Sequence, residues 1–172
     1  VELIEEAAIP VCMVGLLYAL PNTQLTRRLE KEGRLHPARE RKDREALIGA
    51  DQCTLGLNFD TRRPRQEILS DYVRILNRIY DPVAYAGRLE RLARMLANCS
   101  RRQPARRNVG KREMLQKIMS NMPEPRELFS RTLTQCATAN PTAARRILIL
   151  MTLYQDVGPF ARKVVAQIEE MI

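Results

Sequence analysis

Hydrophobic residues change their spacing near the start of the chain. Residues 1–9 separate glutamates from an apolar side, as in the last part of an amphipathic helix, and that side consists of Leu3, Ile4, Ala7 and Ala8. After Pro10 the chain is apolar without alternation up to Leu20, which is typical of a strand covered on both faces in a parallel sheet. The pattern predicts a helix followed by a buried β-strand at Val11–Tyr18.

The next segment carries both a start signal and a stop signal for a helix. Pro21 fixes the entry, and Asn22 or Thr23 can cap the first amides through a side-chain oxygen. Gly33 is placed to adopt the left-handed conformation that ends many helices. Residues 1–35 are therefore expected to form a helix, a strand and a second helix, and residues 36–60 an irregular connection.

Apolar residues recur at helical spacing through most of residues 61–172. The first of these helices begins near Thr61, and the next restarts after the break at Asp81-Pro82. Prolines stand at or near the starts of the later segments, which are predicted at about Lys111–Asn121, Pro125–Cys136, Pro141–Gln155 and Pro159–Ile172. The predicted fold class is mainly α, a helical domain preceded by a helix-strand-helix unit.

The single predicted strand has no clear partner in the chain. A lone strand exposes unpaired backbone groups on both edges and is a poor isolated element. Helix, buried strand and helix is the order of a βα-repeat architecture. The alternative is a purely structural helical scaffold, in which this strand pairs with a region interpreted as loop.

Composition adds the size and broad class of the protein. The chain has 172 residues, of which 45% are hydrophobic and 28% charged, as expected for one soluble globular domain. Its longest apolar stretch, about Ile9 to Leu20, is too short to span a bilayer, so no transmembrane segment is predicted. The chain opens at Val1 without an initiator Met, inside what reads as a helix, and we interpret it as a fragment of a longer protein.

A net charge of +9 raises the question of a nucleic-acid partner. Arg101–Arg112, "RRQPARRNVGKR", has six bases and no acid, but it also lacks an aromatic residue on which a base could stack. We interpret it as an exposed linker and do not expect nucleic acid as a partner. The alternative function is a basic helical module that binds nucleic acid or an acidic protein, and steep salt dependence would distinguish it.

The cysteines and the single histidine do not form a metal-binding motif. No pair has C-x-x-C spacing, and His36 lies in a polar loop. Free thiols in a reducing cytoplasm are the expected state of Cys12, Cys53, Cys99 and Cys136. No catalytic or metal-ligating residue is predicted within this chain.

A longer pattern resembles a known family. "MVGLLYALPNTQLTRRLEKEGRL", Met13–Leu35, resembles the end of the catalytic barrel in cobalamin-binding radical S-adenosylmethionine proteins. "GLNFDT" and "LSDYVRILNRIYDPVAYAGRLERL" resemble the helical C-terminal domain that follows the barrel in a branch containing hopanoid-methylase-like proteins. The resemblance covers about Val1–Leu96. It implies that the predicted strand is at the end of a partial (β/α) barrel, with the helical domain at 61–172.

The resemblance also implies cofactor-binding or substrate-proximal residues. Chemistry in such barrels gathers at the carboxyl ends of the strands, which would place at the rim Leu20, Pro21, Asn22 and Thr23. Asn58 and Phe59 could reach back to that rim, and Arg88 could pair with a carboxylate or phosphate. A pocket for a bulky apolar substrate could be lined by Tyr72, Tyr80 and Tyr85. The alternatives are a helix cap for the rim residues, core positions for the tyrosines and an interdomain or surface ion pair for Arg88.

The family's chemistry requires a C-x-x-x-C-x-x-C triplet for a [4Fe–4S] cluster, and this chain has none. S-adenosylmethionine, the cluster and, where present, cobalamin would thus belong to the parent enzyme. The expected function is that of an accessory segment, inactive alone, which closes the barrel of the same polypeptide and shapes access for a small-molecule or lipid-like substrate. Whether the parent enzyme methylates its substrate stays open.

Overall fold

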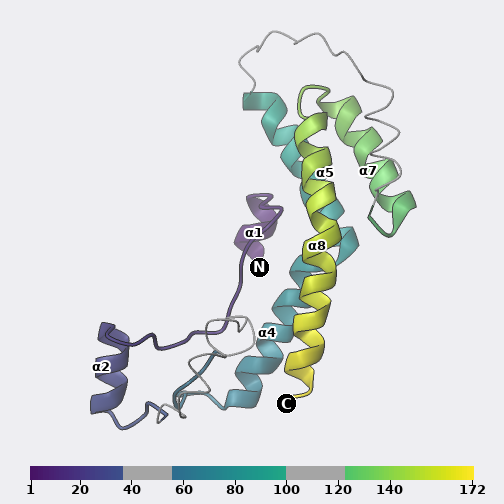
Figure 1. The fold of residues 1–172 in the computed structure, drawn as a ribbon. Helices are drawn as coiled ribbons and strands as arrows, with labels where there is room; N and C mark the ends of the chain where they lie inside the picture. The colour runs from purple at the N-terminus through teal and green to yellow at the C-terminus, as the bar shows by residue number, and fades with distance from the viewer. Residues whose placement is uncertain (37–55, 100–122) are drawn as a thin grey trace. The chain divides into compact units, whose positions relative to one another are not determined.

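The computed structural model describes residues 1–36, 56–99 and 123–172. Within these ranges the chain forms six helices and no β-strand, which confirms the mainly α class. The helices fall into two compact units. Unit 1 contains Val1–Cys12 and Asn77–Ala161, and unit 2 contains Met13–Leu76 and Arg162–Ile172. Each unit is described separately below, and the helices are labelled in Figure 1.

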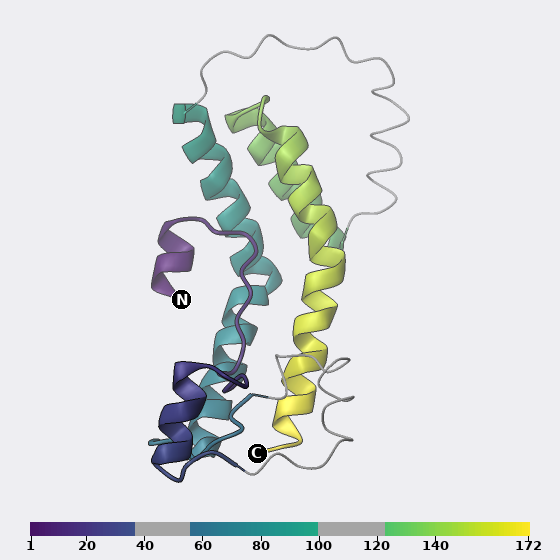
Figure 2. The same cartoon turned by 60° about the vertical axis from the view of Figure 1, so that its left-hand side comes forward.

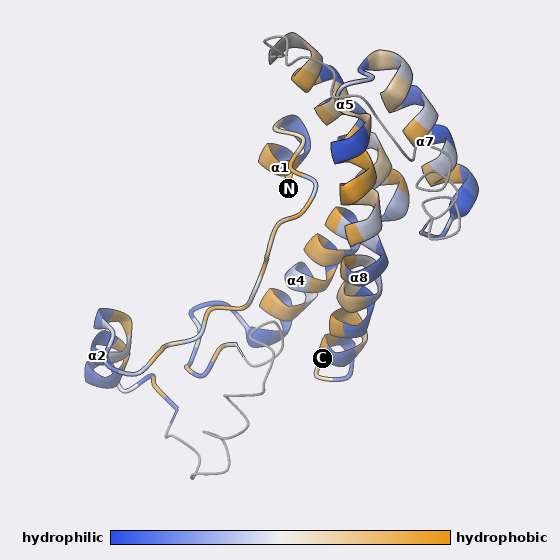
Figure 3. Cartoon of the chain, turned by 45° about the horizontal axis from the view of Figure 1, so that its top comes forward, coloured by the Kyte–Doolittle hydropathy of each residue, from blue (hydrophilic) through white to orange (hydrophobic). Residues whose placement is uncertain are grey.

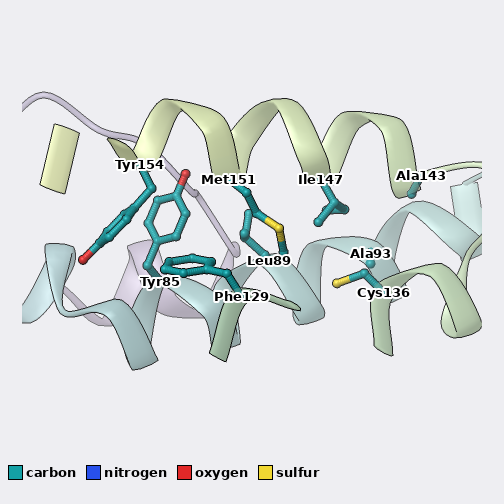
Figure 4. Close-up of a cluster of buried hydrophobic side chains, with 9 residues drawn as sticks. All are labelled: Tyr85, Leu89, Ala93, Phe129, Cys136, Ala143, Ile147, Met151 and Tyr154. Carbon is teal, nitrogen blue, oxygen red and sulfur yellow. The ribbon is translucent and has the colours of Figure 1, made fainter. Parts of the chain in front are cut away.

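Unit 1 is built around the helices α5 (Pro82–Cys99) and α7 (Arg126–Ala139), which pack against each other. It also contains α1 (Glu2–Glu6) and the first part of α8 (Ala144–Glu169). Side chains from α5, α7 and α8 meet in one hydrophobic core (Figure 4), which contains Tyr85, Leu89, Ala93, Phe129, Cys136, Ala143, Ile147, Met151 and Tyr154. The three-dimensional core thus follows the apolar faces that the helical spacing predicts.

The predicted break at Asp81-Pro82 separates α4 (Arg65–Tyr80) from α5. The carboxylate Oδ1 of Asp81 accepts a hydrogen bond of 2.8 Å from the amide of Ala84, which caps the start of α5. Pro82 occupies the first helical position, where its missing amide hydrogen costs little. This boundary was predictable because both of its signals are local.

Unit 2 contains α2 (Gln24–Lys31) and most of α4. Thr23 is the N-cap of α2, and its hydroxyl oxygen accepts a 3.2 Å hydrogen bond from the amide of Thr26. Gly33 has a φ of +66° just beyond the end of this helix. Both observations confirm the start and stop signals. Thr26 and Leu29 supply the buried side of α2.

The strand predicted at Val11–Tyr18 is not formed. These residues are extended and lead into α2 (Figure 2), and the carbonyl of Leu17 accepts a 2.7 Å hydrogen bond from the amide of Leu57. The prediction of two covered faces is also wrong, because Met13 is 95% exposed while Val14 is half-buried. A strand needs a neighbouring ladder, and the described residues contain none.

The partner of the extended segment is instead a short stretch of the predicted connection. Leu57 pairs with Leu17, and Phe59 forms an isolated antiparallel bridge with Leu35. This is part of what the scaffold alternative describes, namely pairing with a region interpreted as loop. In the described part of that region, residues 56–60 make these contacts singly and not as a ladder.

The two last predicted helices are one continuous helix. The sequence predicted a break between Gln155 and Pro159, whereas α8 runs from Ala144 to Glu169 with Pro159 inside. Proline inside a helix removes an amide donor and normally breaks the helix. Buried residues on both sides of this position favour continuation, and they include Met151, Tyr154, Val164 and Ile168.

The helices are amphipathic, with hydrophobic and hydrophilic positions alternating around their surfaces (Figure 3). In the described parts of the chain, no helix combines the length and hydropathy needed to cross a membrane. The helix predicted at Lys111–Asn121 and the basic linker Arg101–Arg112 lie outside the described residues.

Candidate functional site

The structure distributes the candidate site residues over both compact units. Unit 1 contains Tyr80, Tyr85 and Arg88. Unit 2 contains the remaining candidates, which are Leu20, Pro21, Asn22, Thr23, Asn58, Phe59 and Tyr72. Each group is therefore considered within its own unit.

The predicted rim residues form a tight turn before α2. The carbonyl of Leu20 accepts hydrogen bonds from the amide of Thr23 at 3.4 Å, from the Thr23 hydroxyl at 2.9 Å, and from the hydroxyl of Thr26. Asn22 has a φ of +64°, a conformation that asparagine tolerates better than most residues. Pro21 and Asn22 are exposed, so this turn has the geometry of the helix-cap alternative.

Asn58 joins the loop to the extended segment. Its side-chain amide accepts a 2.8 Å hydrogen bond from the Ala19 amide and donates one of 3.2 Å to the Ala19 carbonyl. The side chain thereby binds both backbone groups of Ala19, as a residue of a neighbouring strand would. Phe59, the next residue, is buried. Asn58 thus lies next to the turn that precedes α2, and its side-chain amide is engaged by the backbone of Ala19.

Gly56 allows this pairing because the loop and the extended segment approach very closely. A Cβ atom at position 56 would lie 2.0 Å from the Cβ of Leu16 and 2.8 Å from its Cα. No side chain fits at such a distance. The need for glycine was not visible in the sequence, because it arises from a contact between residues forty positions apart.

The phenol groups of the candidate tyrosines donate hydrogen bonds to backbone carbonyls. In unit 2 Tyr72 donates to Val14 at 3.0 Å. In unit 1 Tyr80 donates to Cys12 at 2.6 Å, and Tyr85 donates to Leu150 at 2.6 Å. Tyr72 and Tyr85 are buried with a hydrogen-bonded hydroxyl, as in the core alternative, whereas Tyr80 is only partly buried.

Tyr85, Phe129 and Tyr154 form a cluster of three aromatic rings. The ring centroid of Tyr85 lies 4.6 Å from that of Tyr154 and 6.3 Å from that of Phe129, and these rings gather at one end of the core (Figure 4). Burial raises the pKa of Tyr85 far above its ordinary value, although the nearby Arg88 opposes the shift. The phenol therefore stays protonated and acts as a hydrogen-bond donor.

Arg88 is the most unusual polar residue of unit 1, because its side chain is completely buried. It donates to the Oε1 of Glu5 at 2.6 Å and to the carbonyl of Ile79, and its guanidinium carbon lies 5.6 Å from the centre of the Tyr85 ring. Its Nε has no hydrogen-bond partner among the described residues. Arg88 therefore makes a buried ion pair within unit 1, whereas the ion-pair alternative placed it at the surface or between domains.

Glu5 contacts a second arginine of α5. Its Oε2 accepts from a terminal nitrogen of Arg91, and its backbone carbonyl accepts from the Arg91 Nε at 3.1 Å. Sequence reasoning placed Glu5 on the solvent side of its helix and missed this contact. The signal was absent from the local pattern, because the partner positions are more than eighty residues away.

An open hollow lies at the start of α4 in unit 2. It has a volume of about 360 Å³ and is lined by His36, Phe59, Asp60, Thr61, Arg62, Arg63, Pro64 and Arg65. His36 Nε2 lies 2.9 Å from Asp60 Oδ1, and Arg63 pairs with Asp71 at 2.9 Å and Glu67 at 3.3 Å. His36, Asp60 and Arg63, which line this hollow, are thus engaged in charged contacts within unit 2.

The described residues do not fit an iron–sulfur cluster. In the ranges that the structure covers, no cluster of three or more His, Cys, Asp or Glu side chains is placed to hold a metal. Cys136 lies in the core, where burial raises the pKa of its thiol to about 11 and the nearby Glu90 acts in the same direction. Burial also raises the pKa of the Cys12 thiol. Neither thiol is poised to become the thiolate that a cluster requires.

These features define a mainly helical domain whose polar groups secure an extended N-terminal segment. Residues 23–170 match the family described as "Domain of unknown function (DUF4070)", and the chain belongs to this family.

A curated protein also matches part of the chain. The chain is 38% identical over 88 residues to the "Uncharacterized methyltransferase sll1242" of Synechocystis sp.. The match covers 51% of this chain and 15% of that relative, so the chain spans a small part of the relative's length. No solved structure matches the chain significantly.

Proposed function

We propose that this chain is the helical accessory segment of a radical S-adenosylmethionine enzyme related to methyltransferases, of the cobalamin-binding type. The observation that carries the proposal is the match to a relative that is named a methyltransferase and is several times longer than the matched part. The resemblance of Met13–Leu35 to the end of a radical S-adenosylmethionine barrel supports the same assignment. In this proposal the cluster, S-adenosylmethionine and cobalamin are held by the rest of the enzyme.

The exposed side of the extended segment supports an accessory role. Met13, Leu17 and Leu20 are each more than half exposed, although they are apolar. The opposite side of the segment is held by the hydroxyl of Tyr72 and the amide of Asn58. We infer that the apolar side packs against the catalytic barrel, which shields a reactive intermediate from water and limits access to a small-molecule or lipid-like substrate.

The test uses the full polypeptide that carries this chain, reconstituted anaerobically with iron and sulfide. We expect it to cleave S-adenosylmethionine to 5′-deoxyadenosine. Leu17→Asp, which places a charge on the proposed packing side, should lower this activity at least several-fold. Gln24→Asp, an exposed position in α2, is the matched control and should leave the activity unchanged.

Two results would contradict the proposal. A full-length protein without cluster and without S-adenosylmethionine cleavage would remove the enzyme class. Equal activity of Leu17→Asp and Gln24→Asp would show that the extended segment does not contact the catalytic part.

A further inference from the structure

The contact between Glu5, Arg88 and Arg91, called the Glu5 clamp below, joins a part of the chain that matches the family to a part that precedes the match. Both arginines lie in α5, inside the region that matches the family, whereas Glu5 precedes the matched region, which begins at residue 23. The family domain thus supplies the cations and the preceding segment supplies the carboxylate. All the residues involved lie in unit 1.

A buried arginine is a poor choice if stability alone matters. Removing its charge from water is costly, and a well-packed hydrophobic residue in its place is often neutral or stabilising. Here the cost is not fully recovered, since the Nε of Arg88 lacks a hydrogen-bond partner among the described residues. Arg88 therefore has a property that an aliphatic residue lacks, namely selectivity for a negatively charged group.

The geometry prepares this site for one carboxylate. A second terminal nitrogen of Arg88 donates to the carbonyl of Ile79 in the last turn of α4, where helix carbonyls lack partners and a cation is favoured. That bond fixes the guanidinium while its other terminal nitrogen contacts Glu5 Oε1. Arg91 takes the remaining oxygen, Oε2, so both oxygens of the carboxylate are bound.

We propose that the Arg88–Arg91 face of α5 is a docking site for an acidic helix of the polypeptide that precedes the family domain, and that Glu5 is the residue it recognises. Residues 1–12 then dock through this carboxylate, and loss of the carboxylate releases them while α5 and α7 stay folded. This inference requires only the ion-pair geometry and does not depend on the proposed enzymatic function.

The test compares Glu5→Gln with Glu2→Gln in the full chain. Both remove one negative charge from α1, but Glu2 is exposed and makes no contact with Arg88 or Arg91 among those the structure shows. Amide hydrogen exchange by NMR reports docking at Ala7 and Ile9, whose amides donate to Leu3 and Ile4. Glu5→Gln should accelerate exchange there about tenfold or more, because an uncompensated buried cation disfavours the docked state.

The control Glu2→Gln should change these rates by less than about twofold, and both variants should leave exchange in α7 unchanged, as expected for local release. Equal rates in the two variants would overturn the proposal. A uniform acceleration across unit 1 would also overturn it, because the ion pair would then serve global stability and not docking.

A second comparison tests the two-arginine geometry without altering the buried residue. Arg91→Gln should accelerate exchange at Ala7 and Ile9. The double variant with Glu5→Gln should accelerate exchange by less than the product of the two single effects, since both single variants remove the ion pair between Arg91 and Glu5 Oε2. Arg94→Gln, an exposed position on the same helix, is the control and should have little effect. Multiplicative effects of the Glu5 and Arg91 changes would contradict a shared carboxylate site.

Discussion

Individual side chains form hydrogen bonds with backbone groups of the extended segment. Tyrosine hydroxyls bind the carbonyls of Cys12 and Val14, each within its own unit, and the amide of Asn58 binds both backbone groups of Ala19. Buried backbone groups need partners, and these contacts supply them where no neighbouring strand is described. The residues that looked like substrate contacts in the sequence thus also have a defined structural task.

Asn58 allows a direct test of this task. Asn58→Asp removes the donor to the Ala19 carbonyl and places a carboxylate against that carbonyl. We expect the free energy of unfolding to fall by about 1–3 kcal/mol, the usual cost of breaking a hydrogen bond at a partly buried polar group. Urea unfolding measures the change, with Asn77→Asp at an exposed position of α4 as control. A loss no larger than that of the control would contradict the assigned role.

Cys136 gives a prediction about pH. Its thiol pKa of about 11 means that folded Cys136 keeps its proton at pH values where the unfolded thiol, with a pKa near 9, has lost it. This group therefore favours the folded state fully below about pH 9, and the contribution is lost as the pH rises towards about 11. A variant that retains only Cys136 should react with a thiol reagent at pH 8 at least about 100-fold more slowly when folded than in urea, given the two pKa values. Rates within tenfold of each other would contradict it.

Local signals decided which elements could be predicted from the sequence. The cap at Thr23, the stop at Gly33 and the break at Asp81-Pro82 each depend on neighbouring residues, and the structure contains all three. The absent strand and the continuous α8 depend on distant contacts instead. Pattern alone could not show that residues 56–60 offer only single contacts to the extended segment, or that burial on both sides of Pro159 maintains the helix.

Because Gly56 lies very close to Leu16, adding a side chain at position 56 should destabilise the fold. Gly56→Ala would place its new Cβ 2.0 Å from the Cβ of Leu16, so one of the two segments must move. We expect a loss of about 1–3 kcal/mol or more in the free energy of unfolding, as for an overpacked core. Gly87→Ala in α5 is the matched control, because its Cβ would meet only the end of Arg91 at 3.8 Å, and alanine favours a helix. Equal stability of the two variants would show that the pairing of 56–60 with the extended segment is wrong.

The continuity of α8 can be tested at Pro159. Pro159→Ala restores an amide donor and removes the clash of the proline ring with the preceding turn. If α8 is continuous, the free energy of unfolding should rise by on the order of 1–3 kcal/mol. Pro82→Ala at the first position of α5 should change it little, since proline is well accepted there. A loss of stability in Pro159→Ala would indicate a helix boundary at this position.

In the whole molecule, the family match and the resemblance to radical S-adenosylmethionine proteins cover overlapping parts of the chain. The family match covers residues 23–170, and the resemblance to a radical S-adenosylmethionine protein starts earlier, at about Val1. Sequence reasoning therefore identified the mainly α class and placed the chain in an accessory role, which remains our proposal. The contact of Glu5 with α5 could not be predicted from the sequence, because the two segments are far apart in the chain.

The most direct test of the central claim is to sequence the coding region immediately upstream of Val1. The account predicts an open reading frame that continues upstream and encodes a C-x-x-x-C-x-x-C triplet within about 200 to 250 residues, the usual size of a (β/α) barrel. The extended segment would then lie at the end of that barrel. An initiator codon directly before Val1, or an upstream domain without the triplet, would contradict the account.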